Sequence, residues 1–173
     1  MITFFFSFFR AGFSIVLGIG FFSFLKFLLY VIFVDCIGVG LCIATIIWFV
    51  SNKFLIKANN MDADVEWGYC FDVHLNAFFP LLVILHFVQL FFYSILISHP
   101  WFIATVFGNT LWLVAIGYYL YITFLGYHSL HILDHTKIFL YPFVPLVIIF
   151  LGSLIANWNI TQSLMNFFHF RVL

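Results

Sequence analysis

The sequence predicts an all-α membrane protein, a single domain built as a bundle of about five transmembrane helices. Of its 173 residues, 66% are hydrophobic and only 7% are charged, whereas a soluble domain has roughly 45–50% apolar and about 25% charged residues. Charged residues and prolines divide the chain into apolar stretches close to the ~20 residues that a helix needs to cross a bilayer. Too few charged residues remain to cover the surface of a soluble helical core.

The predicted spans follow one another with short connections. Arg10 interrupts the first span, Lys26 marks the connection to the second, and the third is long enough to tilt or to begin as an interfacial turn before Pro80. Tryptophans lie near several span ends, where an interfacial belt places them. The tail from Asn157 onward is amphiphilic. We expect spans at about residues 2–25, 27–50, 67–97, 101–127 and 138–156.

In this five-span topology, the polar connections 51–66 and 128–137 lie on the same side of the membrane. That side, which also holds the N-terminus, has one more basic residue than the other side, so the positive-inside rule predicts that it is cytosolic. The sequon Asn159-Ile160-Thr161 would then face the lumen, very close to the fifth span. The charges compared are Lys53, Lys57 and Lys137 on one side and Lys26 and Arg171 on the other.

The chain starts directly with apolar residues and has no basic region before them, so we expect no cleavable signal peptide. We expect that it starts inside its first span, as a truncated gene model or a fragment would. Cys36, Cys42 and Cys70 are an odd number of thiols in or beside apolar segments, and we expect them to pack as small hydrophobic side chains.

The stretch Val65–Pro80, VEWGYCFDVHLNAFFP, carries the densest polar group at the entrance of a span. Asp72 and Asn76 are four residues apart and share a helical face. One interpretation is an acidic pocket at the membrane edge that binds a partner or a cation. The other is a structural arrangement in which acids meet the positive end of the third helix. The candidate partner-binding or structural polar cluster is Glu66, Trp67, Asp72, His74 and Asn76.

Two further polar residues lie at membrane depth, Asp35 and Asn109. Asp35 precedes the small residues Gly40 and Ala44, whose spacing lets helices approach closely. It is either a proton or ion site, or a helix-end acid paired with Lys26 or a neighbouring donor. Asn109, together with Thr123 in the same span, is expected to make interhelical hydrogen bonds worth ~0.6–2 kcal/mol each.

Histidine spacing raises a metal hypothesis. His128, His131 and His135 would share one face of a helical turn, as in a local part of membrane di-iron oxygenases, but the other histidines are isolated. We expect at most an adventitious zinc or nickel ion there, and no physiological metal or cofactor. No catalytic serine motif, phosphate-binding glycine loop or carboxylate pair predicts an enzyme. Six basic and six acidic residues, without a basic run, argue against nucleic-acid binding.

Four runs of sequence give the chain a family resemblance: DCIGVGLCIATIIWFVSNK, VEWGYCFDVHLNAFFPLLVILHFVQLFF, GNTLWLVAIGYYLYITFLGY and YPFVPLV. From about Phe21 to the C-terminus the chain resembles the Unc-fifty family of multi-pass Golgi membrane proteins. The resemblance implies a five-helix bundle with a cytosolic N-terminus. Members carry a hydrophilic, basic region before the first span, which is missing here, and their loop at 128–135 is not histidine-rich.

The resemblance also implies a function, in vesicle-mediated protein transport at the Golgi membrane, or also at the ER or nuclear envelope membrane. Family members are linked to surface delivery of ligand-gated channels such as nicotinic acetylcholine receptors, and to the exchange factors that activate Arf GTPases. The expected role is a non-enzymatic adaptor. The alternative is a small-molecule or ion transporter, or a membrane enzyme, whose site gathers Asp35, Asp72, His74 and Asn109 in the bundle core. A structure separates the two, because the alternative requires those side chains to converge on a cavity.

Overall fold

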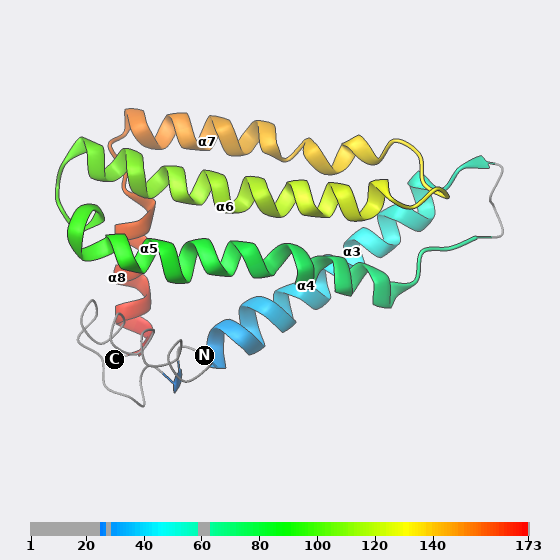
Figure 1. The fold of residues 1–173 in the computed structure, drawn as a ribbon, viewed down its shortest axis with the longest axis horizontal. Coiled ribbons are helices and arrows are strands. Elements are labelled where there is room, and N and C mark those ends of the chain that lie inside the picture. Colours follow the sequence, from blue (N-terminus) through cyan, green and yellow to red (C-terminus); the bar gives the residue numbers. More distant parts are fainter. Residues whose placement is uncertain (1–24, 27–28, 59–62, 173) are drawn as a thin grey trace.

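The computed structural model describes residues 25–26, 29–58 and 63–172, and these residues form helices joined by short connections (Figure 1). The all-α, polytopic fold class predicted from hydropathy is confirmed. The predicted first span, 2–25, lies outside the described residues except for Leu25. The described part of the chain contains four helices long and apolar enough to cross a membrane: Val31–Leu55, Trp67–Val88, Phe102–His128 and Thr136–Ile155.

The first described span is one continuous helix with a π-helical start and end. It runs through η1 (Val31–Gly38), α3 (Val39–Val50) and η2 (Ser51–Leu55). The helix therefore continues five residues past the predicted end at 50, because Ser51 and Leu55 are both buried against the bundle and extend its packed face.

The following helices have bounds that hydropathy places only roughly. The interfacial turn considered before Pro80 is wrong, because α4 is helical from Trp67 and Pro80 lies inside it. A membrane helix tolerates an internal proline when neighbouring groups satisfy the freed carbonyl. A short 3-10 helix, η6 (Thr136–Leu140), begins the last described span, Thr136–Ile155, and the amphiphilic tail forms α8. The remaining elements are α4 (Trp67–Val83), η4 (Ile84–Val88), α5 (Gln89–Phe92), η5 (Tyr93–Ile97), α6 (Phe102–His128), α7 (Phe143–Ile155) and α8 (Ile160–Val172).

Helix α6 is the centre of the described bundle. It packs against α4 on one side and α7 on the other, and it also contacts α8. Figure 1 shows α4, α6 and α7 side by side, α3 crossing them obliquely, and α8 running across the end at which α6 begins. The connections 51–66 and 128–137 therefore meet at the opposite end.

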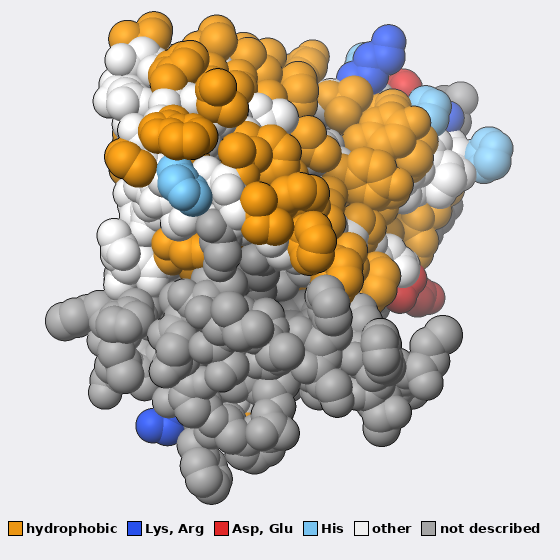
Figure 2. Space-filling view, turned by 60° about the vertical axis from the view of Figure 1, so that its left-hand side comes forward, with side chains coloured by type: hydrophobic (Ala, Val, Ile, Leu, Met, Phe, Trp, Pro, Cys, Tyr) orange, Lys and Arg blue, Asp and Glu red, His pale blue; other side chains and the backbone are white. Residues whose placement is uncertain are grey.

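Small side chains fill the inside of the bundle and large apolar ones face outward. Ala44, Ala77, Ala104 and Ala115 are fully buried, whereas many phenylalanine and isoleucine side chains are exposed. Figure 2 shows hydrophobic side chains covering much of the described face. This distribution is typical of membrane bundles, in which close backbone approach replaces the hydrophobic effect between helices.

Two glycines set how closely α4 approaches its neighbours. A Cβ atom at Gly40 would lie 2.6 Å from Cδ2 of His74, so the His74 ring on α4 packs directly against the backbone of α3 at this glycine. At Gly126, a Cβ would lie 2.9 Å from Cγ1 of Val73, which makes the contact between α4 and α6 equally close. α4 is thus held tightly between α3 and α6.

Gly40→Val should destabilise the bundle, because the added methyl groups overlap the His74 ring and overpacking costs about 1–3 kcal/mol. Thermal unfolding of the full chain in detergent measures the loss. The matched control is Gly152→Val in α7, where an added Cβ meets nothing within 4 Å. Equal stability of the two variants would contradict the close approach of α3 and α4.

Candidate functional site

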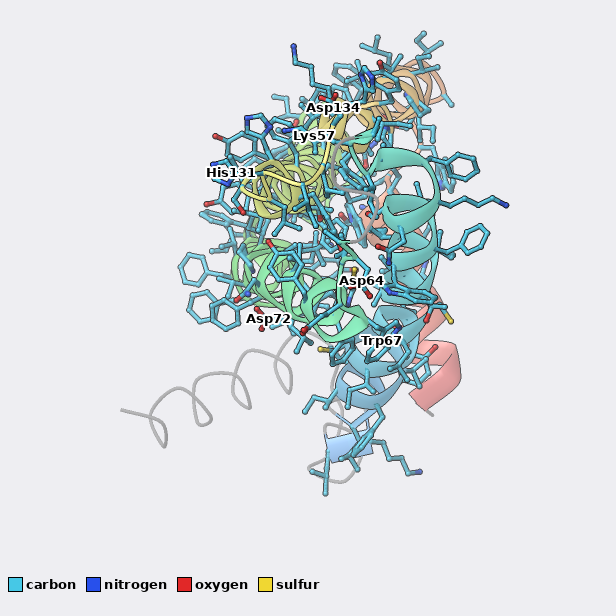
Figure 3. The ribbon with its side chains drawn as sticks, turned by 90° about the vertical axis from the view of Figure 1, so that its right-hand side faces the viewer. Lys57, Asp64, Trp67, Asp72, His131 and Asp134 are labelled. Carbon is cyan, nitrogen blue, oxygen red and sulfur yellow. The ribbon has the colours of Figure 1, made fainter. Side chains whose placement is uncertain are left out.

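The two connecting loops pair with each other at one end of the bundle. Ile56 and Leu133 form an antiparallel bridge. The Lys57 amide donates to the carbonyl of Ile132 at 3.0 Å, and the Asp134 amide donates to the carbonyl of Leu55 at 2.7 Å. Residues 51–58, 63–66 and 129–137 are called the loop platform below, and Figure 3 looks onto this end.

Side chains strengthen this pairing. The Lys57 ammonium donates to the carbonyl of His131 at 2.7 Å, a charge-assisted bond between the two loops. Nδ1 of His128, the last residue of α6, lies 3.0 Å from the hydroxyl of Thr136, which opens η6. This bond joins the residue before the turn to the residue after it, and so holds the end of α6 beside the start of η6.

Asn52 fixes the third part of the platform. Its Nδ2 donates to the carbonyl of Val65 at 3.0 Å, and its Oδ1 accepts from the Val65 amide at 2.7 Å. One side chain thus satisfies both backbone groups of the residue that leads into α4. The sequence signal for this role is weak, because Asn52 is only an amide two residues after the predicted end of the second span at 50.

A buried cluster lies beneath the platform. The hydroxyl of Tyr69 on α4 donates to the carbonyl of Gly126 on α6 at 2.6 Å, which positions the two helices beside the cluster. The cluster contains residues of α3, α4 and α6 and of the two connections 51–66 and 128–137. Burial of its apolar surface therefore couples the platform to the bundle. Its members are Ala44, Leu55, Val65, Cys70, Val73, Tyr127 and Leu133.

The outer side of the platform carries charges of both signs. Figure 3 places Lys57, His131 and Asp134 together on one part of this end, and Asp64 with Trp67 and Asp72 on another. A surface of mixed charge on a fixed backbone has a charge pattern that a surface of complementary pattern can match. The exposed charged or titratable residues are Lys53, Asp64, Glu66, His131, Asp134, His135 and Lys137.

The structure divides the predicted polar cluster of α4 between two faces. Asp72 and Asn76 are exposed and bonded to each other, with Asn76 Nδ2 donating to Asp72 Oδ2 at 3.2 Å. His74 is 3% exposed, because a two-residue step along a helix turns a side chain to nearly the opposite face. Glu66 occupies the N-cap position of α4, but its side chain makes no capping bond. Trp67 donates to the Thr45 hydroxyl at 3.1 Å.

His74 links three helices. Its Nε2 lies 3.3 Å from the carbonyl of Cys36, and its Nδ1 lies 2.8 Å from the hydroxyl of Tyr119. Because a carbonyl only accepts, this network assigns the proton to Nε2 and makes Nδ1 the acceptor of the tyrosine proton. Both nitrogens of a neutral imidazole are therefore satisfied. Sequence reasoning missed Tyr119 as the partner, because the choice depends on how α4 and α6 pack.

The two intramembrane polar residues lie in other places. Asn109, 1% exposed, donates to the Ser153 hydroxyl and to the Trp158 carbonyl, both at 2.9 Å. Its Oδ1 accepts from the Ile160 amide at 3.0 Å, so it joins α6 to α7 and α8. Asp35 lies half-buried in η1 and forms no ion pair with another described residue. Asn109 makes the interhelical bonds expected of it.

The four residues that the transporter alternative requires do not share partners. His74 is bound by Cys36 and Tyr119, Asp72 by Asn76, and Asn109 by groups at the opposite end of the bundle. Asp35 contacts none of the other three through any hydrogen bond or ion pair among the described residues. No shared polar site of these four is present in the described part of the chain.

The helical alignment of histidines expected at 128–135 is wrong. α6 ends at His128, Ser129 caps it, and His135 adopts the left-handed conformation with φ of 53°. The turn separates side chains that a continued helix would have aligned, because its backbone must reverse to pair with residues 55–57. Within the described ranges, no group of three His, Cys, Asp or Glu side chains is placed to hold a metal ion.

The sequon has a structural role. Asn159 is 7% exposed and Thr161 is fully buried. Asn159 Oδ1 accepts from the Gln162 amide at 3.1 Å and so caps α8, while the Thr161 hydroxyl receives the indole N–H of Trp112 at 3.2 Å. A glycan would attach to Nδ2, which faces the Ile97 carbonyl at 3.4 Å in a buried contact, so the folded chain does not present this atom for glycosylation.

Comparison with known proteins identifies relatives over nearly the whole chain. The UNC-50 family model matches residues 1–169, so the similarity extends further toward the N-terminus than Phe21. The unc-50 homolog of Bos taurus is 58% identical over 93% of this chain, and that of Drosophila melanogaster is 52% identical over the same share. The chain spans 62% and 58% of the length of these two relatives. No solved structure matches the chain.

Asn52→Ala should destabilise the segment at Val65 that leads into α4. It leaves both backbone groups of Val65 without their partners, and a buried group left in this way costs about 1–3 kcal/mol. Hydrogen exchange of the Val65 amide, measured on the full chain in detergent, should become about tenfold faster. The matched control is Asn76→Ala, which removes an amide from an exposed pair. Unchanged exchange in the Asn52 variant would show that the clamp does not hold the loop.

Proposed function

Because the chain belongs to the UNC-50 family, we propose that it supports vesicle-mediated protein transport in the membranes of the Golgi and early secretory pathway. Its role is non-enzymatic and includes cell-surface delivery of ligand-gated channels such as nicotinic acetylcholine receptors. The four membrane-capable helices of the described residues support a multi-pass protein. The names of its relatives describe no enzyme.

The molecular role we propose is that of an adaptor for Arf exchange factors, with the loop platform as the docking surface. The observation that carries this proposal is the pairing of residues 55–57 with 132–134, which joins two loops into one surface. Lys53 in η2, Lys57 in the pairing and Lys137 in η6 all belong to this end, and by the positive-inside rule they favour it as the cytosolic end. That end of the bundle is then the one that a cytosolic exchange factor can reach and bind.

The rigidity of the platform supports a binding role. Its three parts are tied by backbone bonds, by Asn52 and by Lys57, so its shape exists before a partner arrives. A preformed surface does not have to be ordered at the cost of binding free energy. Exposed acids and bases lie side by side on it, and such charges select a partner of complementary pattern.

The triple variant Asp64→Lys, Glu66→Lys, Asp134→Lys tests the docking surface. The three side chains are exposed, so their reversal alters the charge pattern with little effect on packing. Capture of the full chain by the catalytic region of a Golgi Arf exchange factor should fall about tenfold, because the introduced lysines would face the basic groups of the partner that the acids now attract. Surface delivery of a nicotinic receptor in cells should fall with it. A second arm, Asp72→Ala with Asn76→Ala, tests whether the exposed pair on α4 extends the surface, and delivery should fall there too.

The control is Lys26→Glu, an exposed charge reversal that precedes Val31, the residue at which the first described span begins at its end away from the platform. Protein level and Golgi localisation should stay normal in all variants. If capture and delivery are unchanged in the triple variant, the platform is not the docking surface. Unchanged delivery in the double variant alone removes Asp72 and Asn76 from it.

A further inference from the structure

A polar pocket opens at the end of the bundle opposite the loop platform. It has a volume of about 320 Å³ and lies between the connection from η5 to α6, the connection from α7 to α8, and the first turns of α8. These connections begin and end membrane spans, so the pocket lies at headgroup level. Trp101 and Trp158, 61% and 55% exposed, flank it as interfacial tryptophans do.

The lining of the pocket is rich in amides and carries no acid, lysine or arginine. Four of its nine residues are amides: Asn157, Asn159, Gln162 and Asn166. Thr105 and Ser163 add hydroxyl groups, and His99 and Trp158 add rings. An amide carries donors and an acceptor on one planar group; in Asn159 both atoms, and in Gln162 the nitrogen, already bind groups of the chain. The Asn157 and Asn166 amides and the Gln162 oxygen are the groups that a ligand would meet. The pocket therefore suits a ligand that also donates and accepts at neighbouring atoms and has no net charge.

The amides are held in place by backbone groups of the facing loop. Gln162 Nε2 donates to the carbonyl of Ile97 at 2.7 Å, and Asn159 Nδ2 approaches the same oxygen at 3.4 Å. These bonds use the nitrogens, and the Gln162 side-chain oxygen takes no part in them. Asn159 is 7% exposed, so a built, desolvated side chain forms the floor of the pocket.

The aromatic wall is fixed in the same way. The indole N–H of Trp158 donates to the Ser163 hydroxyl at 2.7 Å, while its backbone carbonyl accepts from Asn109 at 2.9 Å. Asn157 turns the chain with a left-handed φ of 49°, a conformation that asparagine adopts more readily than most residues. The Trp158 ring is thus presented at the rim with its face available for packing.

We propose that this pocket binds a neutral sugar ring. A hexose offers adjacent hydroxyl groups that pair with amides and a C–H face that packs on an aromatic ring. The volume is at the lower end of the roughly 300–1,000 Å³ of ligand pockets, as one ring requires. A phosphate would call for Arg or Lys, and a hard cation for several carboxylates, and the lining has neither. The sugar comes either from a glycolipid headgroup or from a soluble glycan.

Photo-crosslinking tests the proposal on the full chain in lipid nanodiscs. The probes are a photoactivatable glucosylceramide and the matching ceramide, which lacks the sugar. Glucosylceramide should label peptides within residues 157–166, and ceramide should label them much less. Trp158→Leu and Asn166→Leu should each lower the labelling by about fivefold, the size expected for loss of one favourable contact. Asn166 is exposed, so its replacement leaves the fold intact even if Trp158→Leu does not.

The control variant is Tyr121→Leu, an exposed aromatic on α6 away from the pocket lining, which should label as the unaltered chain does. Competition by free methyl glucoside would support the site and assign it to soluble glycans. Labelling that resists this competitor would support the site and assign it to a membrane glycolipid. Equal labelling by both probes, or unchanged labelling in both pocket variants, would overturn the proposal.

Discussion

The pairing of residues 55–57 with 132–134 fixes how the described helices meet at one end. Residues 55–57 lie at the end of the helix that contains α3 and just after it, and residues 132–134 belong to the connection from α6 to η6 and α7. Asn52, one turn before the pair, binds Val65 and so adds the start of α4. Two connections that hydropathy describes only as polar gaps therefore become one structural unit, and the buried cluster beneath them depends on it.

The same principle recurs in the rest of the bundle, where polar side chains bind backbone atoms of distant segments. His74 binds the Cys36 carbonyl, Tyr69 the Gly126 carbonyl, and Asn109 both the Trp158 carbonyl and the Ile160 amide. In an apolar medium, few competing partners exist for such groups, so a satisfied bond fixes one register of the helices. Glycine and alanine provide the close approach that lets short side chains reach, as Gly40 does beside His74.

Hydropathy predicted the fold class because long apolar segments are a local property of the chain. Asn109 was also identifiable, since an amide within an apolar span requires a partner. Thr123, expected to act in the same way, bonds the carbonyl of Tyr119 on its own helix instead. The roles of Asn52 and Tyr119 and the burial of His74 could not be predicted, because each depends on which segments pack together. The spacing of His128, His131 and His135 wrongly predicted a shared helical face for the same reason, because the loop pairs with residues 55–57 and the helix ends at His128.

Disulfide trapping of Ile56→Cys with Leu133→Cys tests most directly whether the two loops form one surface. The experiment uses the full chain in membranes, with Cys36, Cys42 and Cys70 replaced by alanine. Residues opposite each other in an antiparallel pair have Cα atoms about 4.5–5.5 Å apart, within the range that a disulfide bridges. Mild oxidation should therefore join this pair rapidly and should leave the control pair Phe54→Cys with Leu133→Cys open, because Phe54 faces outward. Absence of the bridge in the first pair, or equal trapping of both, would contradict a platform built from paired loops.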